Sequence, residues 1–131
     1  MLKSMLVKDY MVEDHLSFSP DMEVLDAIDR LLEHRLSGAP VVDGSGCLVG
    51  YLSEKDCLKV ALNATYYEQP GGPVSQFMTR QVKTLDADSS LADAVELFVA
   101  EPYRSYPVID GSRLVGQLTR REALLALKKL A

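Results

Sequence analysis

Two stretches of the chain have the hydrophobic spacing of an amphipathic helix. Apolar residues lie at positions 24, 27, 28, 31 and 32 in the first stretch, and at 91, 94, 95, 98 and 99 in the second. This i, i+3, i+4, i+7, i+8 spacing places them on one helical face. Residues with N-cap and acidic first-turn character precede both stretches, at 19–21 and 86–89. We therefore predict one helix that stops before Ser37-Gly38 and another that stops around Pro102.

A pair of apolar strands is expected after each helix. The apolar runs 39–42 and 106–109 each lead into Asp-Gly, and further apolar runs follow at 48–52 and 114–118. Asp-Gly between two apolar runs predicts a β-hairpin. Short β-like segments at 15–18 and 82–85 precede the helices, and second helices are expected from Glu54 to about Thr65 and from Arg120 onward. Each half therefore reads β-α-β-β-α, with its first two strands parallel across a helical crossover.

The two halves are copies of one another. Val7–Ser45 aligns with Val74–Ser112 at a shift of 67, and Leu48–Leu58 aligns with Leu114–Leu124 at a shift of 66. Of these 50 aligned positions, 15 are identical. The long period and the two copies argue against a solenoid. We predict an α/β fold of α+β-like arrangement, with repeats at 7–65 and 74–131 packed with pseudo-two-fold symmetry and a Gly/Pro-rich linker at 66–73.

Composition and charge narrow the possible functions. The 131 residues include 14 Lys and Arg and 19 Asp and Glu, which gives a net charge of −5. The basic residues form no continuous stripe along the sequence. We therefore expect neither nucleic-acid nor membrane binding, and no apolar run approaches the ~18 residues of a membrane span. The N-terminus lacks the apolar core of a signal peptide, which predicts a cytoplasmic protein.

The cysteines and histidines give little indication of chemistry. Cys47 and Cys57 lack CxxC spacing, and His15 and His34 are isolated, so we predict no metal site. The cysteines are interpreted as small apolar residues of a reducing compartment, with a redox or nucleophilic role as the alternative. The sequence contains no evident nucleophile–base pair or Gly-rich phosphate loop, so we expect no enzymatic activity.

One motif of possible chemical use occurs in both copies. Ser53-Glu54-Lys55-Asp56 and Thr119-Arg120-Arg121-Glu122 are equivalent [ST]-x-x-[DE] segments where the last strand leads into the last helix. One interpretation is a capping box, in which the hydroxyl and the acid satisfy amides at the helix start. The other is a ligand site, where the helix N-terminus binds a phosphate and the carboxylate accepts ribose hydroxyls. The pattern alone leaves both open.

The order of these motifs resembles a tandem pair of cystathionine-β-synthase-type (CBS) domains, from about Val7 to Leu127. The resemblance rests on the lead-ins Val-Lys-Asp-Tyr-Met and Val-Ser-Gln-Phe-Met, the run His-Arg-Leu-Ser-Gly-Ala-Pro-Val-Val-Asp, the two Leu-Val-Gly strands and the two [ST]-x-x-[DE] segments. It implies a stand-alone regulatory, energy-sensing module that binds AMP, ADP, ATP or S-adenosylmethionine in clefts between the repeats and requires no cofactor. It also implies a homodimer and signalling by conformational change to an unknown regulated protein. A ligand-free structural dimerisation module is the alternative.

The resemblance also assigns candidate nucleotide-binding residues. Asp56 corresponds to the ribose acceptor with Ser53 near the phosphate, whereas Thr119 takes the phosphate role beside Glu122, at a position where Asp is commoner. The adenine positions are Val12 and His15 with Ser37, Gly38, Ala39, Pro40 and Val41, and Thr79 and Val82 with Ser105, Tyr106, Pro107 and Val108. The cations nearest the phosphates in sequence are Arg35, Lys55, Arg104, Arg120 and Arg121.

The linings of the two expected clefts differ. Tyr106 is the counterpart of Ala39, and its ring either stacks on a base or fills the second pocket. Glu122 is longer than Asp56 by a methylene, and basic residues are more numerous around Thr119 than around Ser53. Unequal binding by the two clefts is therefore expected, although these differences do not rank them.

Overall fold

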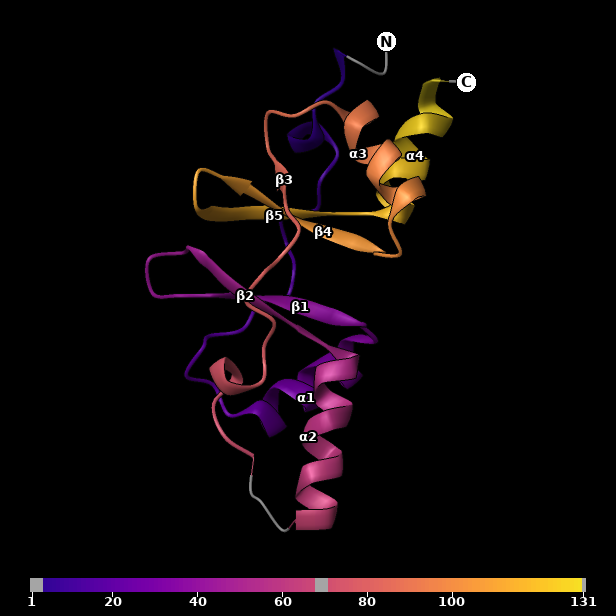
Figure 1. Cartoon of the computed structure of the whole chain (residues 1–131). Helices are drawn as coiled ribbons and strands as arrows, with labels where there is room; N and C mark the ends of the chain where they lie inside the picture. The colour runs from indigo at the N-terminus through magenta and orange to yellow at the C-terminus, as the bar shows by residue number, and fades with distance from the viewer. Residues whose placement is uncertain (1–3, 68–70, 131) are drawn as a thin grey trace. The chain divides into compact units, whose positions relative to one another are not determined.

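The computed structural model describes residues 4–67 and 71–130, which form two compact units. We call Leu16–Val82 the first unit, and Met1–His15 with Lys83–Ala131 the second unit. The elements in chain order, shown in Figure 1, are the 3₁₀ turn η2 (Val7–Asp9), α1 (Val24–His34), β1 (Gly38–Val42), β2 (Leu48–Ser53), α2 (Glu54–Tyr67), the 3₁₀ turn η3 (Val74–Gln76), β3 (Leu85–Asp86), α3 (Leu91–Ala100), β4 (Ser105–Asp110), β5 (Arg113–Thr119) and α4 (Arg120–Leu130).

The first unit is a hairpin covered on one face by two helices. Strands β1 and β2 pair antiparallel, with Gly38 opposite Ser53, and Phe18 forms a parallel bridge to Val41. Helices α1 and α2 lie on the same side of this hairpin (Figure 1). The apolar stripe expected for α1 faces the core, where Val24, Ala27 and Leu31 are buried among the apolar residues of β1 and β2.

The second unit repeats this arrangement with a longer sheet. Strand β3 runs parallel to β4, and β4 pairs antiparallel with β5, with Ser105 opposite Thr119. The parallel crossover and the hairpin predicted from the sequence are confirmed here. Gly111 turns the hairpin with φ of 65°, a conformation that glycine adopts without strain. Helices α3 and α4 lie on one side of the sheet (Figure 1).

Several element boundaries differ from the prediction. Helix α2 runs to Tyr67 rather than Thr65, over the start of the expected linker, because no Gly or Pro interrupts the chain there. Residues 68–70 of that linker lie outside the described residues. The expected strand at 82–85 is reduced to Leu85–Asp86, and Phe18 is the only residue of the segment 15–18 that forms a bridge.

The lead-in of each sequence copy packs on the other copy. Met5–Met11 joins the second unit, where Val7 N–H donates to the Ser89 carbonyl (2.9 Å) and Lys8 N–H donates to the Ala87 carbonyl (3.0 Å). The equivalent bonds of the first unit run from Val74 to Met22 (2.8 Å) and from Ser75 to Pro20 (3.0 Å). Val74 and Met22 are the equivalents of Val7 and Ser89 at the shift of 67, so each bond in one unit has its counterpart in the other. In both units the lead-in comes from one sequence copy and its partner from the other. The duplicated sequence therefore forms two units by exchanging lead-in segments.

The glycines of the two Leu-Val-Gly strands allow this close approach. A side chain at Gly50 would collide with Met78 of the first unit, and one at Gly116 would collide with Met11 of the second. Met11 and Met78 are themselves equivalent lead-in residues. The glycine in each strand is thus explained by the segment that crosses it.

Candidate functional site

Both [ST]-x-x-[DE] segments lie at the junction where the hairpin ends and the last helix begins. In the first unit, Ser53 ends β2 opposite Gly38, and Asp56 lies in the first turn of α2. In the second unit, Thr119 ends β5 opposite Ser105, and Glu122 lies in the first turn of α4. Each unit therefore brings together the start of one strand, the end of its partner and a helix N-terminus.

The first segment forms a complete capping box. Ser53 donates to Asp56 Oδ2 from its backbone N–H (3.0 Å) and from its hydroxyl (2.9 Å), and Asp56 N–H donates back to Ser53 Oγ (3.2 Å). The capping interpretation of this segment is therefore confirmed. Within the described part of the chain, Asp56 Oδ1 accepts no hydrogen bond, so a second role for the carboxylate is compatible with the cap.

The second segment forms only half of a capping box. Glu122 N–H donates to Thr119 Oγ1 at 3.1 Å. Among residues 4–67 and 71–130, the Glu122 carboxylate has neither a hydrogen bond nor an ion pair. The two duplicated acids therefore differ. The Asp56 carboxylate is fixed by two hydrogen bonds from Ser53, whereas the Glu122 carboxylate, which is longer by a methylene, has no such bond in the described chain.

The lead-in segments complete the two sites differently from the sequence-based grouping. Thr79 forms a backbone bridge to Tyr51, which lies opposite Pro40, and all three belong to the first unit. Val12 forms the equivalent bridge to Gln117, opposite Pro107 in the second unit. The expected grouping of Val12 with 37–41 and of Thr79 with 105–108 is wrong because the copies exchange their lead-ins. The grouping of His15 and Val82 with these strands stays a prediction.

The other candidate positions lie at the same end of each hairpin. The carbonyls of Ser37 and Arg104, which are equivalent residues, accept hydrogen bonds from Glu54 N–H (2.8 Å) and Arg120 N–H (2.9 Å). Ala39 is fully buried in the first core. Pro40 in the first unit and Pro107 in the second are also fully buried. Gly38 lies so close to the Tyr51 ring that a β-carbon would contact it at 2.5 Å.

Tyr106 fills the core of the second unit and does not present its ring for stacking on a base. Only 1% of the residue is exposed, and its ring centroid lies 4.8 Å from that of Phe98. Its hydroxyl donates to Glu101 Oε1 (2.7 Å) and to the Leu97 carbonyl (3.2 Å). Burial and the bond to Glu101 raise the pKa of Tyr106, and bonds from Tyr106 and Lys83 lower the pKa of Glu101.

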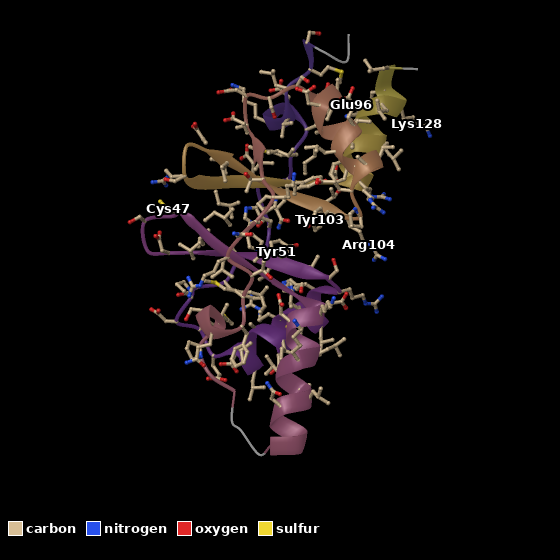
Figure 2. All side chains as sticks on the ribbon, viewed as in Figure 1. Cys47, Tyr51, Glu96, Tyr103, Arg104 and Lys128 are labelled. Atoms are coloured by element: carbon tan, nitrogen blue, oxygen red, sulfur yellow. The ribbon has the colours of Figure 1, made fainter. Side chains whose placement is uncertain are left out.

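Basic side chains surround the start of α4. Arg104, Arg120 and Arg121 are all exposed, and within the described chain none of them forms an ion pair. Arg120 Nε donates to the Tyr103 carbonyl at 3.0 Å, which ties the helix start to the α3–β4 connection. Figure 2 labels Tyr103 and Arg104 on that connection. In the first unit, Arg35 and Lys55 are the exposed candidates.

Sequence reasoning missed two residues on the sheet face that carries Ser53 and Thr119. Gln117 of β5 and its counterpart Tyr51 of β2 lie two residues before these hydroxyls. Tyr51 is labelled in Figure 2. Gln117 is only 8% exposed, although it is polar. A glutamine between glycine and leucine in an otherwise apolar strand was the available signal.

The described residues give no indication of metal or thiol chemistry. Over residues 4–67 and 71–130, no group of three or more His, Cys, Asp or Glu is placed to hold a metal ion. Burial, together with Asp56 and Glu54, raises the pKa of the Cys57 thiol to about 11. In the same part of the chain, no helix has the length and apolar character needed to cross a bilayer.

This architecture, two copies of a helix, a β-hairpin and a second helix with a hydroxyl-capped strand-to-helix junction in each, defines a duplicated α+β module. The CBS domain family model matches residues 7–63 and 74–129. The chain therefore belongs to the CBS domain family and contains two CBS domains.

Similar proteins include larger enzymes and small CBS proteins. The chain is 32% identical over 120 residues to an A-adding tRNA nucleotidyltransferase of Aquifex aeolicus, covering 92% of this chain but 13% of that protein. It is 32% identical over 111 residues to the CBS domain-containing protein YhcV of Bacillus subtilis, covering 84% of this chain and 76% of YhcV. The CBS-pair protein CBSX2 from Arabidopsis thaliana superposes with a TM-score of 0.83 at 28% identity, covering 97% and 96% of the two chains. CBSX2 in complex with AMP gives 0.84 at 29% identity, covering 96% and 98%.

Proposed function

We propose that the chain is a regulatory module that binds an adenosine-containing ligand, with AMP as the first candidate. The observation that carries this proposal is the Ser53–Asp56 junction, where an ordered carboxylate keeps one oxygen unbonded beside a helix N-terminus. Similarity to CBSX2, of which one crystal structure is a complex with AMP, supports the choice of ligand. ADP, ATP and S-adenosylmethionine remain in the test panel because all share the adenosine group.

The proposed contacts follow the chemistry of the parts. Asp56 Oδ1 would accept ribose hydroxyls while Oδ2 keeps its two bonds to Ser53. The first turn of each last helix carries amides without intrahelical partners and a partial positive charge, which suits a phosphate. In the first unit the proposed contacts are Ser37, Gly38, Pro40, Ser53, Asp56, Thr79 and Val82. In the second they are Val12, His15, Arg104, Ser105, Pro107, Thr119, Arg121 and Glu122.

The test is a binding panel on the purified protein. Thermal unfolding and calorimetry are measured with AMP, ADP, ATP and S-adenosylmethionine, with ribose 5-phosphate and inorganic phosphate as controls. Ligand at 100 times its dissociation constant should stabilise the fold by about 2.7 kcal/mol. An unchanged melting temperature across the adenosine compounds at millimolar concentration would contradict ligand binding.

A second candidate function is self-association without a ligand. It is favoured by exposed leucines on the last helix of each unit: Leu58 (70%) and Leu62 (54%) on α2, and Leu124 (66%) on α4. Leu58 and Leu62 are one helical turn apart and so lie side by side on α2. Adjoining exposed apolar side chains of this kind, rather than scattered single ones, mark interaction surfaces. Light scattering coupled to chromatography would measure the mass, and a homodimer that binds no adenosine compound would favour this function.

A further inference from the structure

Gln117 is the one polar residue that is buried among residues 4–63 and 71–130. It lies in β5 between Gly116 and Leu118, both of which are buried. Burying an amide is costly unless its donors and acceptor find partners. Its hydrogen bonds therefore indicate what the residue is positioned to do.

The side-chain amide of Gln117 is only partly satisfied. Ser105 Oγ donates to Gln117 Oε1 at 3.2 Å, and within residues 4–67 and 71–130 the amide makes no other hydrogen bond. The Ser105 hydroxyl can either donate or accept, so whichever end of the amide it contacts, the other end lacks a partner. No fully buried side-chain nitrogen or oxygen in this part of the chain lacks a partner. The unbonded Nε2 of this nearly buried side chain therefore keeps contact with solvent.

The backbone fixes the position of this donor. The backbones of Gln117 and Val12 form two hydrogen bonds. Gln117 N–H donates to the Val12 carbonyl (2.9 Å), and Val12 N–H donates to the Gln117 carbonyl (2.7 Å). On its other side it lies opposite Pro107 in β4. Side chains two residues apart on a strand share a face, so Gln117 lies on the face of Thr119, the proposed phosphate contact.

We propose that Gln117 reads the base of the ligand bound in the second unit. Its Nε2 donates a hydrogen bond to a ring nitrogen of the purine. Its Oε1 has a second lone pair beyond the one used by Ser105, which accepts a hydrogen from the adenine amino group. Glutamine pairs with adenine through this combination of donor and acceptor. This inference rests on the proposed function and adds a side-chain contact for the base.

The first unit offers no such amide. Tyr51 occupies the equivalent position, and its ring lies against Gly38, the equivalent of Ser105. The duplicated positions therefore present an aromatic ring in one unit and a hydrogen-bonding amide in the other. Base recognition by a glutamine is thus confined to the second unit.

The first experiment observes the amide itself. The chain has four glutamines and one asparagine, so the side-chain amide region of a ¹⁵N–¹H spectrum is simple. The two N–H signals that disappear in Gln117→Met are those of the Gln117 side-chain amide. Titration of the unmodified protein with AMP should shift the Gln117 amide in step with binding, while exposed Gln76 stays in place. AMP binding, measured by calorimetry, that leaves the Gln117 amide unmoved would overturn the inference and leave the proposed function standing.

The second experiment tests for a direct contact. AMP and analogues in which ring nitrogen N1 or N7, the two that flank the amino group, is replaced by C–H are titrated against the unmodified protein, Gln117→Met and the control Gln76→Met. The analogue with N3 replaced, on the opposite edge of the base, serves as the negative control. Gln117→Met should weaken AMP binding at least roughly fivefold to tenfold, the usual range for one hydrogen bond. It should weaken less the binding of the one analogue that lacks the contacted nitrogen, because only the contact with the amino group is then left to lose. Additive effects for all three analogues would overturn the inference. Absence of binding by any adenosine compound would overturn the proposed function as well.

Discussion

Replacing Asp56 by alanine separates the two roles assigned to its carboxylate. The structural role is the cap, since Asp56 Oδ2 accepts from Ser53 N–H at 3.0 Å and from Ser53 Oγ at 2.9 Å. Loss of a capping residue costs about 1 kcal/mol, which corresponds to a fall in Tm of roughly 3–5 °C for a chain of this size. The ligand role predicts a loss of affinity of about 1.5–3 kcal/mol, or roughly 10- to 150-fold, because ribose hydroxyls lose a charged acceptor.

Asp56→Asn distinguishes these roles because the amide keeps an oxygen for Ser53 and removes the charge. We expect Asp56→Asn to lose less stability than Asp56→Ala, because the amide oxygen can still accept hydrogen bonds from Ser53, and still to bind AMP more weakly. Glu122→Ala is the matched structural control, because the Glu122 carboxylate forms no bond in the described chain, and its Tm should not change. Differential scanning calorimetry and isothermal titration of the same preparations measure both quantities.

One result would refute the reasoning about the ligand. If Asp56→Ala lowers Tm by several degrees and AMP binds both Asp56 variants as it binds the unmodified protein, the carboxylate acts only as a cap. Unchanged stability of Asp56→Ala would instead contradict the contribution assigned to the two hydrogen bonds that the carboxylate accepts from Ser53.

Three further predictions follow from single residues. Arg35, which ends α1 with φ of 54°, should be replaceable by glycine with a gain of about 1 kcal/mol in the free energy of unfolding, measured by urea denaturation; a loss would contradict the strain. Tyr106→Phe should cost about 1–2 kcal/mol in the same assay and raise the pKa of Glu101 in an NMR titration, because the tyrosine hydroxyl no longer stabilises that carboxylate; an unchanged Glu101 pKa would contradict this. Cys57, whose pKa is about 11, should alkylate far more slowly at pH 8 than the partly exposed Cys47, and its own rate should rise as the pH approaches 11. Mass spectrometry measures both rates, and equal rates at pH 8 would contradict the burial of Cys57.

The regular elements could be predicted because local signals specify them. The apolar spacing at 24–32 and 91–99 and the two Asp-Gly turns each act within about a dozen residues, and α1, α3 and both hairpins formed as expected. The end of α2 was predicted less well, since no residue before Pro70 stops a helix. Glycine and proline set the last residue at which a helix can end, but the helix can also end before them.

The sequence indicated the strand-to-helix junctions but not which lead-in segment packs beside each of them. The [ST]-x-x-[DE] segments were found because hydroxyl and acid are close in sequence. The partners of Thr79 and Val12 could not be deduced, because a duplicated chain offers each lead-in two nearly identical docking surfaces. Alignment of the copies cannot distinguish packing within a copy from packing between copies, since both give the same hydrogen bonds at a shift of 67.

The duplication preserves the backbone and varies the side chains that would meet a ligand. Equivalent hydrogen bonds hold the lead-ins, and equivalent glycines accommodate Met11 and Met78. On the same framework, Gly38 has no side chain where Ser105 carries a hydroxyl, and Tyr51 is replaced by Gln117. Packing against the exchanged lead-in constrains the first set in both units alike, whereas nothing in the fold requires the second set to match. Two sites built this way share a geometry and differ in chemistry, so one ligand should not bind both equally.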